Sequence, residues 1–232
     1  MRSRIAVLAS GGGSNLQAIL DHFDALGDRR AGDVVFVASN REDAGALERA
    51  VRREIPTAVL AGAGPAAIDE LLTANAIDLV VLAGYLRLVP PEIVAKYDGR
   101  IVNIHPALLP AFGGPGMYGM RVHHAVVESG ARVTGATVHF VNDVYDRGRI
   151  IAQWPVPVFS SDDAGTVAAR VLRVEHILYP RVVQGVASGR FTLQNCASAD
   201  APFIDARPSF TLLPHEDSRL AENIELALGE GC

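Results

Sequence analysis

The side chains best suited to chemistry stand at the end of an apolar run, in the stretch RIVNIHPALLP of residues 100–110. Asn103 and His105 are two residues apart, so on an extended strand both point to the same face. Pro106 biases the residue before it away from helix, which ends the strand at His105. Because ligands bind at the carboxyl ends of parallel strands, the pair predicts a site that sets an amide donor beside an acid–base imidazole.

A carboxylate for this site could come from the turn-rich stretch of residues 143–148, which carries Asp143 and Asp146. A carboxylate beside His105 would raise the pKa of the ring, whereas a dry pocket would lower it. The alternative is that His105 is a strand-end residue with a satisfied ring and that Asn103 only forms a turn. The shared strand face, the strand end and the acidic turn together favour acid–base catalysis.

Metal and nucleophile chemistry find less support in the sequence. His123 and His124 are adjacent and cannot both face one ion, and no His-x3-His or Cys-x2-Cys spacing occurs. A Gly-x-Ser-x-Gly nucleophile motif is absent as well. We therefore expect a site without a metal.

A glycine-rich turn, SGGGSN at residues 10–15, follows the first apolar run of the chain. Ser14 or Asn15 could cap a helix that starts near Leu16. Such a turn presents free backbone N–H groups and the positive end of the helix dipole, which suits a phosphate. The stretch matches neither the P-loop nor the dinucleotide fingerprint. The residues alone leave a bare turn and a phosphate cradle equally open.

The elements that would position these groups alternate between strands and helices. Short apolar runs predict strands over residues 5–9, 34–38, 57–60, 78–83 and 100–104, with helices between them. The second half is β-rich over residues 134–158 and predicts an antiparallel addition, in which Thr137, His139 and Val141 share one face. A long helix then runs from Asp162 or Asp163 to about residue 184, and RFTLQN (190–195) predicts a small strand. This order is typical of an α/β fold with a mostly parallel, Rossmann-like twisted sheet covered by helices on both faces.

Composition bounds the partners and the compartment. The net charge of −5 gives no reason to expect nucleic acid or an anionic membrane as a partner. The two cysteines suggest no disulfide framework, so a reducing cytoplasm is the expected location. No apolar run approaches the ~20 residues that a membrane helix needs.

Several motifs together resemble the phosphoribosylglycinamide formyltransferases, which are folate-dependent enzymes of purine synthesis within the wider formyltransferase family. The motifs are SGGGSNLQA, VLAGYLRLVP, NIHPALLP, GATVHFVNDVYDRGRIIAQ and VEHILYP. They cover roughly residues 4–195 in the family's order. We therefore expect one formyltransferase domain over residues 1–195 and a C-terminal extension of uncertain structure over residues 196–232.

The resemblance implies a role for each matching residue. Asn103, His105 and Asp146 match the family's catalytic trio. Five residues match the contacts of the ribotide phosphate and glycinamide: Gly12, Gly13, Ser14, Asn15 and Glu175. The residues that match the folate pocket are Leu86, Arg87, Leu88, Val89, Asn103, Val141, Asn142, Asp143 and Asp146. The implied co-substrate is 10-formyltetrahydrofolate, without a metal, and the expected partners are these small molecules in a monomer or a homodimer.

The implied reaction moves a formyl group from the folate to the glycinamide amine, with Asn103 and a protonated His105 stabilising the oxyanion. Asp146 would hold His105 charged and help move the proton. Two other functions stay open: hydrolysis, as in the formyltetrahydrofolate deformylases, which usually carry an extra N-terminal domain, and non-catalytic binding of a phosphosugar. Methionyl-tRNA formyltransferases are less similar because they lack the SGGGSNLQA stretch.

The chain also departs from the family: residues 61–65 lack a common arginine, loop 112–121 is longer and richer in glycine, and Arg149 replaces a usual proline.

Overall fold

A computed structural model describes residues 1–197 and 217–228 of the chain. One seven-stranded sheet has the strand order β3-β2-β1-β4-β5-β6-β7. The strands are β1 (Ser3–Leu8), β2 (Gly32–Ser39), β3 (Thr57–Val59), β4 (Leu79–Leu82), β5 (Ile101–His105), β6 (Val133–Phe140) and β7 (Ile150–Pro157). Strands β1 to β5 pair in parallel, whereas β6 is antiparallel to both β5 and β7. The predicted fold class and the antiparallel addition are both confirmed.

Seven α-helices are described. They are α1 (Ser14–Leu26), α2 (Gly45–Val51), α3 (Pro65–Ala74), α4 (Pro91–Lys96), α5 (Met120–Glu128), α6 (Ala164–Ala187) and α7 (Asp217–Leu228). Two short 3-10 turns cover Gly27–Arg29 and Asn195–Ala197. The predicted cap of α6 is confirmed at Asp163, whose side chain accepts a hydrogen bond from the Thr166 N–H.

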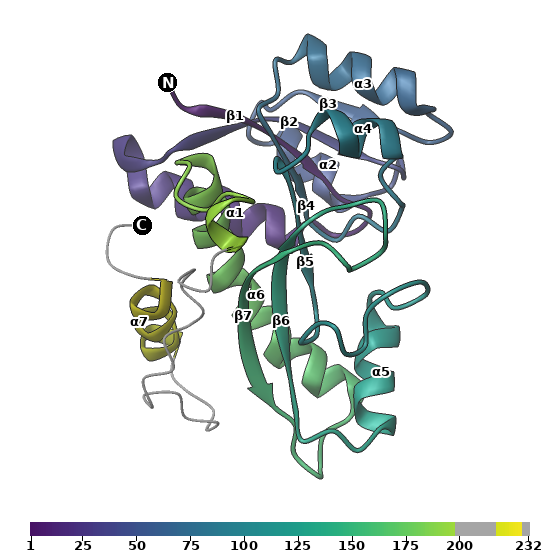
Figure 1. The fold of residues 1–232 in the computed structure, drawn as a ribbon, viewed down its shortest axis with the longest axis vertical. Coiled ribbons are helices and arrows are strands. Elements are labelled where there is room, and N and C mark those ends of the chain that lie inside the picture. The colour runs from purple at the N-terminus through teal and green to yellow at the C-terminus, as the bar shows by residue number, and fades with distance from the viewer. Residues whose placement is uncertain (198–216, 229–232) are drawn as a thin grey trace.

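The sheet separates two hydrophobic cores because successive strand residues point to opposite faces. Ile5 and Val7 of β1 lie in the core that α1, α2 and α6 cover, whereas Ala6 and Leu8 lie in the core under α3 and α4. Figure 1 shows α3 and α4 grouped at one end of the molecule and α6 running along the other face of the sheet. Burial on both faces explains why these strands are continuous apolar runs rather than alternating ones.

Two local predictions are wrong. Neither Ser14 nor Asn15 caps α1: the helix begins at Ser14, and its N-cap is Gly13, in a left-handed conformation with φ 73°. Residues 190–195 form a turn instead of a strand, because Phe191 packs against the bare backbone of Gly185 and the Asn195 side chain donates to the Arg190 carbonyl. These tertiary contacts outweigh the strand propensity of the RFTL residues.

Part of the expected C-terminal extension, the stretch SRLAENIELAL of residues 218–228, lies in α7. Leu220, Ile224 and Leu228 are buried in the same core as α1 and α6, and Arg181 of α6 forms an ion pair with Glu225. In the view of Figure 1, α7 and α5 flank the lower part of the sheet on opposite sides. The boundary at residue 195 stays a prediction, and residues 198–216 and 229–232 of the expected extension lie outside the described residues.

Candidate active site

Strand β5 places Asn103 and His105 on the face that also carries Ile101. Val102 and Ile104 point into the opposite core and anchor the strand there. Asn103 is half-buried and His105 only 3% exposed. The local geometry expected from the Asn-x-His-Pro sequence is therefore present at the carboxyl end of a central strand.

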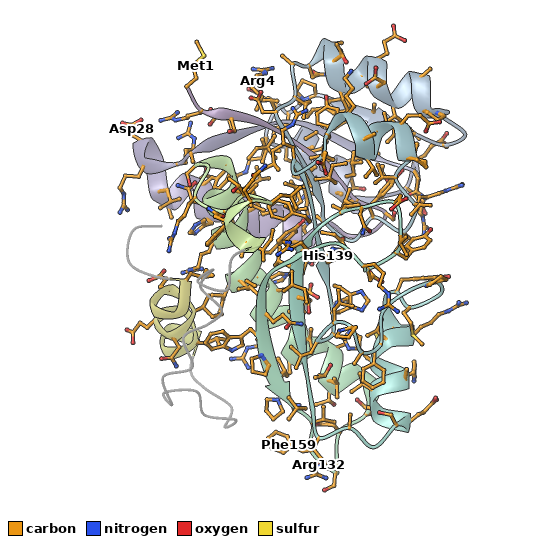
Figure 2. The ribbon with its side chains drawn as sticks, viewed as in Figure 1. Met1, Arg4, Asp28, Arg132, His139 and Phe159 are labelled. Carbon is orange, nitrogen blue, oxygen red and sulfur yellow. The ribbon has the colours of Figure 1, made fainter. Side chains whose placement is uncertain are left out.

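The antiparallel register adds His139, to which the sequence alone assigned no role. Asn103 pairs with His139 across β5 and β6, and the Asn103 Nδ2 lies 3.1 Å from the His139 Nε2. The other ring nitrogen, Nδ1, lies 2.7 Å from the Phe140 carbonyl oxygen, which can only accept. In its neutral form His139 therefore carries its proton on Nδ1 and accepts from the Asn103 amide, which orients that amide, whereas a proton on Nε2 would face Asp146. Figure 2 shows His139 near the centre of the molecule.

Asp146 reaches the two histidines from the loop between β6 and β7. The backbone of Asp146 has φ 54°. Two residues later only glycine fits, because a Cβ on Gly148 would lie 1.6 Å from the Phe140 carbonyl oxygen. One carboxylate oxygen lies 3.6 Å from the His105 Nδ1 and accepts a 2.8 Å hydrogen bond from the Gly114 N–H. The other lies 3.7 Å from the His139 Nε2. The loop thus brings the three predicted catalytic residues together.

His105 stands between two acceptors. Its Nε2 donates to the Phe112 carbonyl oxygen at 2.8 Å, and its Nδ1 faces Asp146. Burial lowers the pKa of His105, and this effect outweighs Asp146 and the Phe112 carbonyl, which raise it. This balance favours a neutral ring, whereas the resemblance implies that Asp146 holds the ring charged.

Asp146 is the charged member of this group. Burial raises the pKa of its carboxyl, but the interaction with His139, the nearby His105 ring and the Gly114 N–H together outweigh it, so the pKa lies below the ordinary value. An anionic carboxylate that faces the unprotonated Nδ1 of His105 stabilises the positive charge of the ring when a proton arrives there. The geometry suits proton transfer through His105.

A cavity of about 720 Å³ opens beside this group. Most of the predicted residues line it: Asn15, Leu86, Arg87, Leu88, Val89, Asn103, His105, Val141, Asn142, Asp146 and Glu175. Four predicted residues do not line it: Gly12, Gly13, Ser14 and Asp143. The glycine-rich loop 114–119, where the chain departs from the family pattern, forms another part of the wall.

Asn15 and Glu175 form a buried pair in the cavity wall. The Asn15 Nδ2 donates to the Glu175 Oε2 at 2.7 Å, and the buried Asn15 Oδ1 has no partner. Burial raises the pKa of Glu175 to about 7, with the Asn15 hydrogen bond acting in the opposite direction. Glu175 can therefore gain or lose a proton near neutral pH.

The start of α1 lies next to this pair. Because Gly13 caps the helix without a side chain, the first N–H groups of α1 have no side-chain cap. These groups and the dipole of a 13-residue helix suit an anion.

The described residues contain no cluster of three or more His, Cys, Asp or Glu side chains that could hold a metal ion. Within the same residues, no helix is long and apolar enough to cross a membrane.

The fold and the site correspond to one enzyme family. Residues 3–183 match the family described as Formyl transferase, and the seven-stranded mixed sheet matches solved formyltransferase structures. The chain belongs to the formyl transferase family.

Within that family, the chain is similar to phosphoribosylglycinamide formyltransferases. It is 46% identical to the chloroplastic enzyme of Arabidopsis thaliana over 82% of this chain and 67% of that protein. It is 41% identical to the Escherichia coli enzyme over 84% of this chain and 92% of that protein. The solved structure of glycinamide ribonucleotide transformylase 1 from Symbiobacterium toebii superposes with a TM-score of 0.74 at 42% identity, over 82% of this chain and 89% of that one.

Other similar proteins are longer or have a different function. The chain spans 62% of the Vigna unguiculata enzyme and 19% of the human trifunctional purine biosynthetic protein adenosine-3. A formyltetrahydrofolate deformylase from Pseudomonas syringae has the same fold, with a TM-score of 0.73 at 25% identity, and the match covers 63% of that chain. The fold alone therefore does not separate transfer from hydrolysis.

Proposed function

We propose that this chain transfers the formyl group of 10-formyltetrahydrofolate to the amine of 5'-phosphoribosylglycinamide, a step of purine synthesis. The observation that carries the proposal is the shared cavity. Its lining includes Asn103, His105 and Asp146, the segment 86–89, and Asn15 with Glu175. A donor and an acceptor substrate must meet in one place for direct transfer, and this cavity offers a contact for each.

The reaction begins when the glycinamide amine attacks the formyl carbon, and the carbonyl electron pair moves onto oxygen. Asn103 has two amide hydrogens, and His139 accepts only one of them. The other is available to the developing oxyanion, and such a donor commonly contributes about 10²–10³ in rate. His139 thus serves to hold the Asn103 amide in place.

The amine must then lose a proton, and the folate N10 must gain one as the carbon–nitrogen bond breaks. We assign this transfer to His105, whose Nδ1 faces the anionic Asp146. The ring can stabilise the oxyanion directly only if its Nε2 exchanges the Phe112 carbonyl for that oxygen. Loop 112–119, which carries this carbonyl, is therefore expected to shift when substrates bind.

Glu175 and the start of α1 are proposed to hold the ribotide. The carboxyl with its pKa near 7 can accept a proton from the glycinamide ammonium on binding, while the helix N-terminus receives the phosphate. The folate is proposed to contact segment 86–89 and residues 141–143, including Asp143, which would have to turn inward. No metal enters this scheme, and a cytoplasmic monomer or homodimer remains the proposed setting.

One assay separates transfer from hydrolysis. The protein is incubated with 10-formyltetrahydrofolate, with and without phosphoribosylglycinamide, and the release of tetrahydrofolate is followed. The proposal predicts release that depends on the ribotide and formation of an equal amount of formylated ribotide. Equal release without the ribotide would assign the chain to the hydrolases instead.

A further inference from the structure

Helix α2 packs against the glycine-rich turn of residues 11–13. The Ala46 N–H donates to the Gly11 carbonyl at 3.1 Å, and the Arg49 Nε donates to the Gly12 carbonyl at 2.7 Å. The packing leaves no room for a side chain at Gly13 and little room for one at Gly45. A Cβ on Gly13 would lie 2.7 Å from the Ala46 Cα, and one on Gly45 would lie 3.3 Å from the Gly12 Cα.

These two hydrogen bonds fix the direction of two successive peptide groups. In a planar trans peptide the C=O and the following N–H point in opposite directions. Because the carbonyls of Gly11 and Gly12 point to α2, the N–H groups of Gly12 and Gly13 point away from it. Neither N–H donates to any atom within the part of the chain that the structure describes. Both are therefore available to a ligand at the start of α1.

A second contact, with α1, holds the Arg49 side chain in place. Its Nη1 donates to the Gln17 Oε1 of α1 at 3.1 Å, so that one guanidinium ties α2, α1 and the loop together. The half-buried side chain also places a positive charge beside the loop. The hydrogen bond from Nε to a carbonyl is charge-assisted, and a lysine cannot reproduce its geometry.

We propose that Arg49 is a positioning residue for the ribotide phosphate: it orients the Gly12–Gly13 peptide so that the loop N–H groups face the phosphate. This inference rests on the proposed function, because it deepens the account of the same site. Arg49 acts through the loop and need not touch the substrate. Its loss should weaken binding of the phosphate end and leave the folate end unchanged.

The test compares four proteins: the wild type, Arg49→Met, Arg49→Lys and Arg52→Met. Arg52 is the matched control, since it caps the C-terminus of the same helix and its exposed side chain pairs, within the described residues, with Glu48. KM for phosphoribosylglycinamide is expected to rise about 10-fold or more in Arg49→Met, with KM for the folate changed less than twofold. Arg49→Lys should recover little of this loss, and Arg52→Met should match the wild type.

Two results would overturn the proposal. One is an unchanged KM for the ribotide in Arg49→Met, and the other is full recovery in Arg49→Lys, which would mean that charge alone matters. A parallel measurement needs no activity: ribose 5-phosphate should raise the Tm of the wild type and of Arg52→Met, but not that of Arg49→Met. A wild type that binds ribose 5-phosphate but transfers no formyl group would contradict the proposed function while leaving the role of Arg49 testable by this shift.

Discussion

The two ends of the cavity are built in opposite ways. Around Asn103, His105 and His139, the ring nitrogens and the Asn103 Nδ2 contact one another, Asp146 or backbone carbonyls, and the one buried atom without a partner among the described residues is the Nδ1 of the neighbouring His123. Around Asn15 and the start of α1, a buried amide oxygen has no partner among the described residues, and the first N–H groups of the helix have no side-chain cap there. A satisfied polar network is rigid, whereas buried polar groups without partners are costly unless a ligand completes them. The difference suggests that one end performs the chemistry and the other holds a substrate.

The largest effect is expected from Asp146→Asn. The amide keeps the shape of the carboxylate and can still accept from the Gly114 N–H, but it removes the charge that faces His105. We expect kcat to fall by about 10²–10⁴, with the KM for the ribotide nearly unchanged. Steady-state kinetics and Tm measurements on this variant and on the exposed control Asp28→Asn check the prediction. Near-normal turnover in Asp146→Asn would remove the carboxylate from the mechanism.

A somewhat smaller loss is expected from Asn103→Ala. The change removes one proposed donor to the oxyanion, which commonly costs about 10²–10³ in kcat. The His139 ring, buried with 2% exposure, would also lose the donor to its Nε2. Asn103→Asp is a sharper test of this donor, because the side chain keeps its size while a carboxylate oxygen, which only accepts, replaces the amide N–H group. Activity in Asn103→Asp equal to that of the wild type would argue against this donor.

At the other end, Asn15→Ala should change binding more than chemistry. The substitution removes the donor to Glu175 and the unpartnered amide oxygen. We expect KM for phosphoribosylglycinamide to rise about 10-fold, with a smaller change in kcat. Asn75→Ala is the control, since the Asn75 side chain only donates to the Leu71 carbonyl on distant α3. A fall in kcat without a change in KM would place Asn15 with the chemical end.

The last effect concerns stability and its pH dependence at Glu175, rather than turnover or substrate binding. Its folded-state pKa of about 7 lies above the ordinary value of 4.5, so the native state holds a proton that the unfolded chain releases. Stability from this group is complete below pH 4.5 and is lost as the pH rises toward 7, by on the order of 3 kcal/mol.

Glu175→Gln removes this titration and keeps an acceptor for Asn15. The Tm of the variant should equal that of the wild type near pH 4.5 and exceed it increasingly up to pH 8, by about 2–4 °C for each kcal/mol. Thermal unfolding at several pH values measures the difference in Tm between the variant and the wild type. The other titrating groups are the same in both proteins, so their effects cancel in this difference. A difference in Tm that does not depend on pH would contradict the raised pKa.

The sequence predicted the parts of this molecule that local patterns determine. The parallel strands were visible as short apolar runs, and Asn103 with His105 stood out because Pro106 ends their strand. No comparable local pattern indicated a role for His139. Its place opposite Asn103 depends on the antiparallel register of two strands 36 residues apart, and the only signal was its shared face with Thr137 and Val141.

The incorrect predictions have a similar origin. A cap at Ser14 or Asn15 is the usual local choice, but with the left-handed Gly13 as N-cap the helix starts one or two residues earlier. The charge of His105 depends on burial, which outweighs Asp146 and cannot be read from the sequence around either residue. The predicted roles of the folate and ribotide residues remain proposals, although most of these residues line one cavity.

The division of the cavity into two ends is tested most directly by binding without turnover. Isothermal titration of phosphoribosylglycinamide into the wild type, Asp146→Asn and Asn15→Ala gives Kd for each. The account predicts that Asp146→Asn binds the ribotide as tightly as the wild type, while Asn15→Ala binds it about 10-fold more weakly. Equal weakening in both variants would contradict the account, because the two ends would then act as a single binding unit.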